Sequence, residues 1–281
     1  MSLLDRIRTC QIWDRARYRP FRVAGQSVGW VTGDVAQRLR GFPKLFRISD
    51  ASVDLDPGLT SFEARSEAVA EALLALKAEG LVRGWRNEPY PVGTDFYAPP
   101  LMQMERAAVP LFGVRAYGVH INGFVGEGED LKLWVGKRAA NKQTAPGKLD
   151  HIVAGGQPMG LSLMENVIKE SAEEAGMEAA LARQARPVGL VSYITERSEG
   201  LRNDICFAYD IVLPDSFVPH NTDGEIESFS LWPIAEVRKR VAETEDFKFN
   251  VALVNIDFLI RHGHLSPDEP GYVDLAEGLR L

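Results

Sequence analysis

Hydrophobic and polar residues recur with helical spacing in one clear stretch of the first half of the chain. In residues 62–80, alanine and leucine return every three or four positions, which predicts an amphipathic helix. Thr60 and Glu63 have the spacing of a capping box at its start, and Gly80 is a typical helix stop. The apolar positions expected to form its buried stripe are Ala68, Ala72, Leu73 and Leu76.

The second half of the chain alternates between strand and helix patterns. Residues 113–125 and 131–139 are apolar runs separated by the turn-forming sequence GEGED, and they predict two strands. Three further strand patterns and then two helix patterns follow, at 187–196, 203–214, 224–233, 234–243 and 250–265. Strands that bracket helices predict an α/β fold.

A proline-bearing segment, residues 87–110, separates the two halves. Its irregular pattern predicts an extended connector and a domain boundary near residues 107–110. We therefore expect a smaller α+β domain over residues 1–110 and an α/β domain over residues 111–281.

Composition places the chain among ordinary globular proteins. Its 281 residues are 45% hydrophobic and 25% charged, and no stretch approaches the roughly 18 apolar residues of a membrane-spanning helix. A net charge of −7 argues against nonspecific binding of nucleic acid. Cys10 and Cys206 suggest no disulfide framework, and the N-terminal stretch has no apolar signal-peptide core. We expect a cytoplasmic monomer or homodimer with no membrane or nucleic-acid partner.

The strongest chemical signal is a glycine-rich loop followed by a helix with three glutamates. The glycine loop, residues 153–160 (VAGGQPMG), leads into a helical stretch that ends at Gly176. An α-helix turns about 100° per residue, so Glu170, Glu173 and Glu174 point into one arc of roughly 100°. A solvated helix face is one explanation. The glycine loop favours a Mg²⁺ site, because Mg²⁺ prefers oxygen ligands and commonly bridges to substrate phosphates.

This stretch resembles the Nudix hydrolase signature: glycine, five residues, glutamate, seven residues, Arg-Glu, an apolar residue, any residue, Glu-Glu, any residue, glycine and an apolar residue. Signature positions with matching residues are Gly155, Glu170, Glu173, Glu174, Gly176 and Met177. Leu161 replaces the early glutamate, Lys169 the arginine and Ser171 the apolar residue. In the family the first two are mainly a structural pair. Glu165, four residues before Lys169, is expected to take over that pairing.

The resemblance implies an α/β/α sandwich with a mixed sheet, and a diphosphate hydrolase that uses Mg²⁺, or Mn²⁺ in its place. Glu170 and Glu174 would bind the metal directly. Glu173 would bind metal or help to deprotonate the attacking water. Gly155 and Gly156 would shape the loop that brings the phosphates of a small-molecule diphosphate to the metal.

Several segments resemble a narrower group, the Nudix proteins related to thiamine-pyrophosphokinase-associated proteins of fungi and plants. They include LFGVRAYGVHINGFV, VSYITERSEGLRNDICFAYDIVLP and FKFNVALVNIDFLIRHG. That group carries an N-terminal extension of unassigned function, which residues 1–110 match in length. The resemblance implies hydrolysis of thiamine diphosphate, or of its oxidised or damaged analogues, to the monophosphate and phosphate.

Two further groups of residues are candidates for the same site. Glu225 and Glu227 share strand parity, and one of them is expected to add a carboxylate to the metal or the water, an exposed strand carboxylate being the alternative. A basic loop precedes the glycine loop, where Arg138 is preferred over Lys142 and Lys148 as the cation that holds phosphates.

Other nearby side chains have a structural explanation beside the functional one. Asp150 is a candidate substrate contact, and His151 is more often structural at the start of a strand. Trp134 and Tyr193 could stack on a heteroaromatic ring, although core packing is the commoner role for each. Trp134 is retained as a candidate substrate contact.

The sequence leaves other functions open. A Nudix enzyme could cleave ADP-ribose or a dinucleotide, and a Nudix-fold module could sense ligands without catalysis, although such modules commonly lose the glutamates kept here. The N-terminal domain could be the active part, but it shows no nucleophile–base pair. An isopentenyl-diphosphate isomerase would need a reactive cysteine, whereas Cys206 lies in an apolar run that predicts a buried strand.

Overall fold

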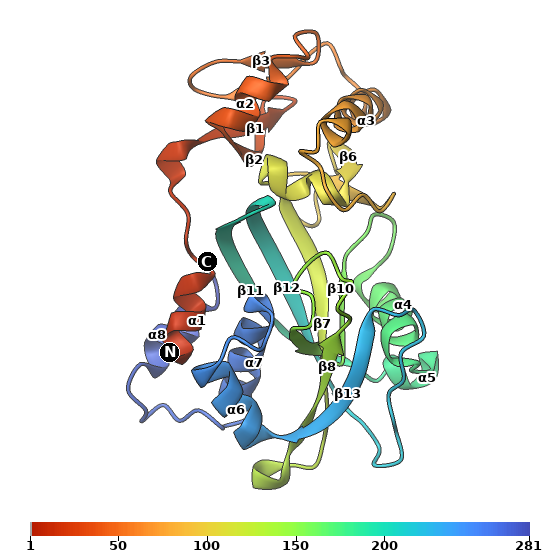
Figure 1. Cartoon of the computed structure of the whole chain (residues 1–281), viewed down its shortest axis with the longest axis vertical. Coiled ribbons are helices and arrows are strands. Elements are labelled where there is room, and N and C mark those ends of the chain that lie inside the picture. Colours follow the sequence, from red (N-terminus) through yellow and green to blue (C-terminus); the bar gives the residue numbers. More distant parts are fainter. Residues whose placement is uncertain (1) are drawn as a thin grey trace.

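The computed structural model describes residues 2–281, and its first region is built on a small sheet (Figure 1). This sheet has the strand order β2-β1-β4-β3, and a separate two-stranded hairpin, β5-β6, lies beside it. The elements of this first region are η1 (Arg15–Arg17), β1 (Tyr18–Val23), β2 (Gln26–Thr32), α2 (Gly33–Leu39), β3 (Phe46–Ile48), β4 (Val53–Leu55), α3 (Phe62–Ala78), β5 (Pro89–Val92), β6 (Met102–Glu105) and η2 (Arg106–Phe112).

The second region is built on a seven-stranded mixed sheet. Its main path is β11-β12-β7-β8-β13, with β10 paired to β7 and β9 to β8. β12 runs parallel to β7, whereas β11 and β12 are antiparallel. The elements are α1 (Leu3–Thr9), β7 (Arg115–Val125), η3 (Gly128–Asp130), β8 (Lys132–Arg138), β9 (Leu149–His151), β10 (Val153–Gly156), α4 (Leu163–Ala175), α5 (Ala179–Ala182), β11 (Arg186–Arg197), β12 (Gly200–Val212), β13 (Ile226–Pro233), α6 (Ile234–Glu243), α7 (Phe249–Arg261) and α8 (Tyr272–Gly278).

Helices cover both faces of the seven-stranded sheet. Figure 1 shows α4 and α5 on one side of it and α6 and α7 on the other. One apolar core joins the sheet to α1, α6, α7 and α8, and a second joins it to α4 and α5 through Val167 and Ala182. Burial of these apolar side chains supplies the main force that holds the layers together. The predicted α/β/α sandwich with a mixed sheet is confirmed.

The connector predicted over residues 87–110 is wrong, because this segment is folded. β5 and β6 pair as an antiparallel hairpin, and η2 follows directly. Tyr90 and Val92 alternate with Pro89 and Pro91, and the first pair is buried in the core of the first region. Proline is tolerated in a two-stranded sheet because both strands are edges. The prolines therefore hid the alternation of buried and more exposed positions that would otherwise have predicted a strand.

The division at residue 110 stays a prediction, and α1 departs from it. Ile7 and Cys10 are buried in the core formed with α6, α7 and α8, not in the core of the first region. In Figure 1, α1 lies beside α7 and α8 accordingly. Residues 3–10 thus pack with the far end of the chain.

The predicted start of α3 is one residue early. Ser61 is the N-cap, and its hydroxyl accepts a hydrogen bond from the backbone N–H of Ala64, so Thr60 and Glu63 form no capping box. The buried stripe contains Ala72, Leu73 and Leu76 as predicted, but Val69 takes the place of Ala68. The full set of buried α3 residues is Ser66, Val69, Ala72, Leu73 and Leu76.

Two further sequence-level findings concern the chain as a whole. No helix within residues 2–281 is long and apolar enough to cross a membrane. Cys10 and Cys206 are both buried, and neither forms a disulfide.

Candidate active site

The glutamate helix, α4, is defined at both ends by local interactions. Ser162 is its N-cap and forms a capping box with Glu165, whose carboxylate accepts hydrogen bonds from the Ser162 backbone N–H and hydroxyl at 2.8 and 2.7 Å. Gly176 ends the helix in the left-handed conformation, with φ of 61°. The predicted pairing of Glu165 with Lys169 is therefore wrong, because the carboxylate is used at the helix start.

Lys169 instead neutralises two of the three glutamates. Its ammonium group lies 3.1 Å from a carboxylate oxygen of Glu170 and 2.7 Å from one of Glu173. Partial burial lowers the pKa of Lys169, but these two carboxylates outweigh that effect and raise the pKa to about 12. The residue at the signature's arginine position is a fixed positive charge among the carboxylates.

The three glutamates have different environments. Glu174 is 3% exposed, and its carboxylate accepts a 2.7 Å hydrogen bond from the backbone N–H of Ala154 in β10. The side chain of Glu170 is 12% exposed, and that of Glu173 is 47% exposed. Burial raises the pKa of Glu174 well above its usual range and also raises that of Glu170. Two carboxylates therefore face the protein, and the third faces solvent.

These carboxylates do not converge on one point in the structure. Within residues 2–281, the one group of three or more potential ligand atoms lying within 4.8 Å of each other belongs to His120, Asp150 and His151. Lys169 lies against two of the glutamates, whereas Glu174 is held by the backbone of β10. Their role as a common metal site stays a prediction.

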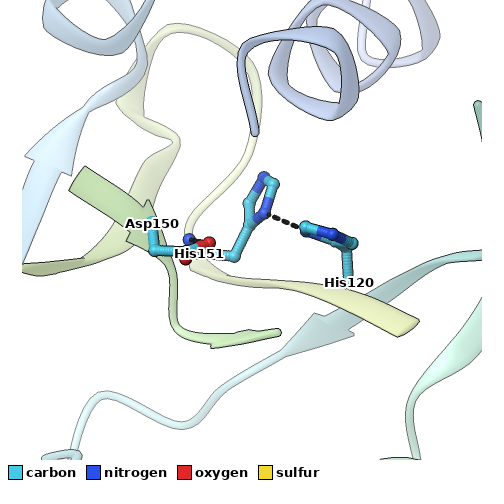
Figure 2. Close-up of side chains that lie close together, drawn as sticks. All are labelled: His120, Asp150 and His151. Carbon is cyan, nitrogen blue, oxygen red and sulfur yellow. Dashed lines mark hydrogen bonds between the residues drawn. The ribbon is translucent and has the colours of Figure 1, made fainter. Parts of the chain in front are cut away.

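The histidine group does not suit a cation. Figure 2 shows His120 from β7 and His151 from β9 meeting through their Nδ1 atoms, which lie 2.9 Å apart. Asp150 is already ion-paired with Arg138 at 2.7 Å and faces Lys248 at 3.9 Å. Burial would raise the pKa of Asp150, but these two cations hold it down to about 2. A carboxylate neutralised twice has little attraction left for a metal.

Both imidazoles of this group are neutral at physiological pH. Burial lowers the pKa of His151 to about 4 and that of His120 well below its usual value. One Nδ1 therefore donates to the other, and the pair links β7 to β9, which do not pair directly in the sheet. This fits the structural explanation given for His151.

The two glycines of the loop make room for side chains from opposite sides. A Cβ atom at Gly155 would overlap the carboxyl group of Glu170, which comes from α4. A Cβ atom at Gly156 would overlap the hydroxyl group of Tyr90 and lie 3.2 Å from Cζ of Arg106, both from the first region. The absence of side chains at these positions lets both regions approach the loop.

A basic cavity of about 110 Å³ opens beside the glycine loop. The first region supplies Arg86, Tyr90 and Arg106 to its wall. Six basic side chains line it against two carboxylates, although the chain as a whole carries a net charge of −7. The six are Arg86, Arg106, Arg138, Lys142, Arg202 and Lys248, and the two are Asp204 and Glu225.

Glu225 and Glu227, predicted as alternatives, lie in different places. Glu225 lines the basic cavity, where it pairs with Lys142 and lies 3.5 Å from Arg86. Glu227 forms an exposed ion pair with Lys137 at 2.9 Å. The strand pairing shifts register between Ile226 and Ser228, so the two glutamates do not keep a regular alternation. The structure brings only Glu225 to the cavity.

The basic loop residues have different partners, and because both Arg138 and Lys142 line the basic cavity, the preference for Arg138 stays a prediction. The guanidinium group of Arg138 donates to Asp150 and to the carbonyl oxygens of Thr144 and Ala145, so its donors are committed within the protein. Lys142 reaches the cavity, whereas Lys148 donates to the carbonyl oxygen of Glu245. Arg138 thus anchors the loop that presents Lys142.

The two aromatic candidates, Trp134 and Tyr193, lie in different environments. Trp134 packs with the core between the sheet and α4 and is not among the residues that line the basic cavity. Tyr193 lines the cavity, but its hydroxyl group donates to Asp204 at 2.5 Å and its ring packs edge-on against Phe249. Core packing is the observed role of Trp134.

Sequence reasoning missed the residues that reach the cavity from a distance. Tyr90 and Arg106 come from the segment interpreted as a connector, and Arg86 directly precedes it. Arg202 and Lys248 come from strand and helix ends. The buried alternation of Tyr90 with Val92 is the signal that could have revealed a packed strand here.

Cys206 has the environment of a packed strand residue. It is 3% exposed, and burial raises the pKa of its thiol to about 12. A thiol of this kind is protonated at neutral pH and is a poor nucleophile. The discounted isomerase interpretation gains no support from it.

Relatives of known name match most of the chain. Nudix hydrolase 20, chloroplastic, of Arabidopsis thaliana is 44% identical over 270 residues, which are 93% of this chain and 72% of that protein. Nudix hydrolase 24, chloroplastic, of the same plant is 45% identical over 263 residues, with the same shares of each chain.

These names correct one prediction from composition. Both plant relatives are named chloroplastic, so the expectation of a cytoplasmic protein is wrong. Two free cysteines and an acidic composition fit several reducing compartments equally well, so they could not distinguish among them. The predicted oligomeric state and the absence of a nucleic-acid partner stay predictions.

Two further comparisons each match part of the chain. Residues 2–116 match the model of a domain of unknown function, DUF4743. The MutT protein from Methanosarcina mazei Go1 is a structural neighbour with a TM-score of 0.40 and 19% identity, over 53% of this chain and 94% of that one. On its 44–45% identity to named Nudix hydrolases across 72% of their length, this chain belongs to the Nudix hydrolase family.

Proposed function

We propose that this Nudix hydrolase cleaves the diphosphate linkage of thiamine diphosphate, or of its oxidised or damaged analogues, with Mg²⁺ or Mn²⁺ as cofactor. The observation that carries the proposal is the basic cavity lined by the glycine loop, which itself contacts α4 through the hydrogen bond from Ala154 to Glu174. An excess of cationic side chains in a protein of net charge −7 favours an anionic ligand at that place. The choice of the thiamine group rests on the sequence resemblance.

The size of the basic cavity suits the phosphates of a substrate. Pockets that enclose a whole drug-sized ligand measure about 300–1,000 Å³, and this one measures about 110 Å³. Arg106 and Lys142 line it next to Gly155 and Gly156. Arginine can bind a phosphate through two parallel hydrogen bonds, so we assign these two cations to the diphosphate.

The glutamates of α4 fit a divalent cation by their charge. Glu174 is buried near Asp150, Glu170 and Glu225, and their negative charges add to the effect of burial in raising its pKa. A cation bound among these oxygens would offset that repulsion. Glu170 and Glu174 would hold Mg²⁺ from the protein side, and Glu173 from the solvent side. The bound ion would polarise a phosphoryl oxygen and lower the pKa of a water molecule.

The reaction consumes one water molecule. The water oxygen attacks the terminal phosphorus, the bond from that phosphorus to the bridging oxygen breaks, and the bridging oxygen stays with the monophosphate. Glu173, the most exposed of the three glutamates, would accept a proton from the attacking water if it does not bind metal. Arg106 and Lys142 would stabilise the charge that develops on the phosphoryl oxygens.

A panel of diphosphates tests the assignment. Thiamine diphosphate, oxidised thiamine diphosphate, ADP-ribose and a dinucleotide would be incubated with and without Mg²⁺, and products identified by mass. We expect metal-dependent release of orthophosphate from the thiamine compounds. Release of a mononucleotide from ADP-ribose or the dinucleotide, with the thiamine compounds untouched, would instead support the alternative substrates. Turnover that is equal without metal contradicts the metal site.

A further inference from the structure

A second cavity, of about 280 Å³, adjoins the basic cavity and shares Tyr117 with it. It lies between the loop that joins β5 to β6 and the end of the glycine loop. We call it the aromatic cavity. Its lining residues are Pro91, Gly93, Asp95, Phe96, Ala98, Pro100, Tyr117, Gln157, Pro158, Met159, Gly160 and Leu161.

Aromatic side chains from two distant segments, Phe96 and Tyr117, line this cavity, and both pack against Phe207, which is not among the lining residues. The ring centroid of Phe96 lies 4.8 Å from that of Tyr117 and 5.0 Å from that of Phe207. Phe96 and Tyr117 are half-buried, and both line the aromatic cavity. Aromatic faces and edges of this kind favour another planar ring at about 4.5–7 Å between centroids.

Gln157 brings an unpartnered acceptor to the same cavity. It is 4% exposed, and its side-chain Nε2 donates to the carbonyl oxygen of Leu161 at 2.6 Å, which fixes the orientation of the amide. Its backbone N–H donates to the carbonyl oxygen of Tyr117 at 2.8 Å. The side-chain Oε1 is buried and has no hydrogen-bond partner. A buried acceptor without a partner is costly, so it points to a donor supplied by a ligand.

The two cavities differ in charge. The aromatic cavity is lined by no basic residue and by one carboxylate, that of Asp95, whereas basic residues dominate the other. One oxygen of Asp95 accepts hydrogen bonds from the backbone N–H groups of Tyr97 and Ala98 at 2.8 Å, which fixes the loop that carries Phe96. Phosphates are therefore favoured in the basic cavity and a neutral or cationic group in the aromatic one.

We propose that the aromatic cavity binds the heteroaromatic ring of the substrate, with Phe96 and Tyr117 against the ring and Oε1 of Gln157 accepting a hydrogen bond from an amino group on it. The proposal rests on the proposed function in so far as the diphosphate occupies the basic cavity. It gives residues 2–116, matched by a domain of unknown function, a part in substrate recognition. The loop after β5 would form one wall of the ring site.

Binding to the metal-free protein tests this without turnover. Titration calorimetry in EDTA would use three probes: thiamine diphosphate and ADP, whose rings carry an amino group, and inorganic diphosphate, which has no ring. The variants are Gln157→Leu, which replaces the amide by an apolar side chain of similar size, and Phe96→Leu, which removes the aromatic ring but keeps an apolar side chain. Tyr97→Leu is the matched control, because Tyr97 is 86% exposed and does not line the cavity.

We expect the wild-type protein to bind at least one ring-bearing diphosphate about tenfold more tightly than inorganic diphosphate. Gln157→Leu and Phe96→Leu should remove most of that gain and leave the affinity for inorganic diphosphate within twofold, and Tyr97→Leu should change neither. The ring site is overturned if the wild-type protein binds ring-bearing diphosphates no more tightly than inorganic diphosphate. It is also overturned if the two variants lose affinity equally for all three probes. Failure of the proposed function would appear separately, as an absence of hydrolysis with Mg²⁺.

Discussion

The hydroxyl group of Tyr90 lies against the α-carbon of Gly156, in the space that a side chain at that position would fill. Tyr90 belongs to the β5–β6 hairpin, and Gly156 is the last residue of β10 in the glycine loop. The backbone N–H of Met159 also donates to the carbonyl oxygen of Pro89 at 3.2 Å. The hairpin is therefore docked on the loop that leads to α4.

Gly156→Ala is expected to separate these two segments. The new methyl group would overlap the Tyr90 hydroxyl, and such overpacking costs about 1–3 kcal/mol. We expect a lower melting temperature and a loss of hydrolysis by about tenfold or more. Tyr90→Phe removes the oxygen that clashes, so the double variant should recover part of both losses. Thermal unfolding and steady-state kinetics would measure the effects.

Gly33→Ala serves as the control for this prediction, because a Cβ atom there has no neighbour within 4 Å. It should unfold and react like the wild-type protein. An equal loss in Gly156→Ala with and without Tyr90→Phe would contradict the proposed contact.

Glu225→Gln and Glu227→Gln are a matched pair. Glu225 forms ion pairs with Lys142 and Arg86 at the basic cavity. Burial would raise the pKa of Glu225, but these two cations outweigh it and keep the pKa below its usual value. Its replacement should reduce kcat/KM for a diphosphate by roughly 10-fold, as for other residues that position a binding group. Glu227 faces solvent with Lys137, so its replacement should have little effect. An equal change in kcat/KM for the two variants would contradict a role for Glu225 in the basic cavity.

Much of the site's helix follows from local sequence, whereas its partners do not. The end at Gly176 and the positions of Glu170, Glu173 and Glu174 depend on residues close in the chain, and the helix forms where the pattern predicts it. Lys169 was noted as a departure from the signature, but its contacts with two of those glutamates depend on side-chain orientation. Local patterns predict elements better than they predict which charged groups meet.

The wall supplied by the first region could not be predicted, because its contacts join distant parts of the chain. Arg106 lies about fifty residues before Gly156 in the sequence, and no local period relates them. For Glu225 and Glu227, one irregular position in β13 was enough to defeat an argument from strand parity. Long-range docking and single-residue irregularities therefore set the limits of the sequence analysis.

Buried neutral histidines predict loss of stability in acid. The pKa of His151 is lowered by burial to about 4, from an ordinary value of 6.5 that applies in the unfolded chain. A lowered histidine pKa means that the unfolded chain binds more protons, so this contribution to stability is complete above pH 6.5 and is lost as the pH falls toward 4. Urea unfolding at pH 7 and pH 4.5 would measure it. In His151→Gln the decrease over this interval should be smaller.

Glu174→Gln is expected to raise the stability of the metal-free protein and to lower its activity with Mg²⁺. At neutral pH the buried carboxylate of Glu174 is destabilising in the metal-free protein, because burial raises its pKa and Asp150, Glu170 and Glu225 add to that effect. Glutamine keeps an oxygen that can accept the hydrogen bond from Ala154. The variant should therefore have a higher melting temperature than the wild-type protein in EDTA, while its hydrolysis with Mg²⁺ falls by about 100-fold or more.

The pH dependence of this comparison gives its sharpest check. A raised carboxyl pKa means that the folded protein binds the proton more tightly. The penalty from Glu174 is therefore absent below the ordinary pKa of glutamate and grows as the pH rises from that value toward the raised one. The stability advantage of Glu174→Gln should therefore be largest at neutral pH and disappear as the pH is lowered. Glu173→Gln is the control, because the Glu173 side chain is 47% exposed and its removal relieves no buried charge. An advantage for Glu174→Gln that is constant with pH would show that ionisation of Glu174 does not cause it.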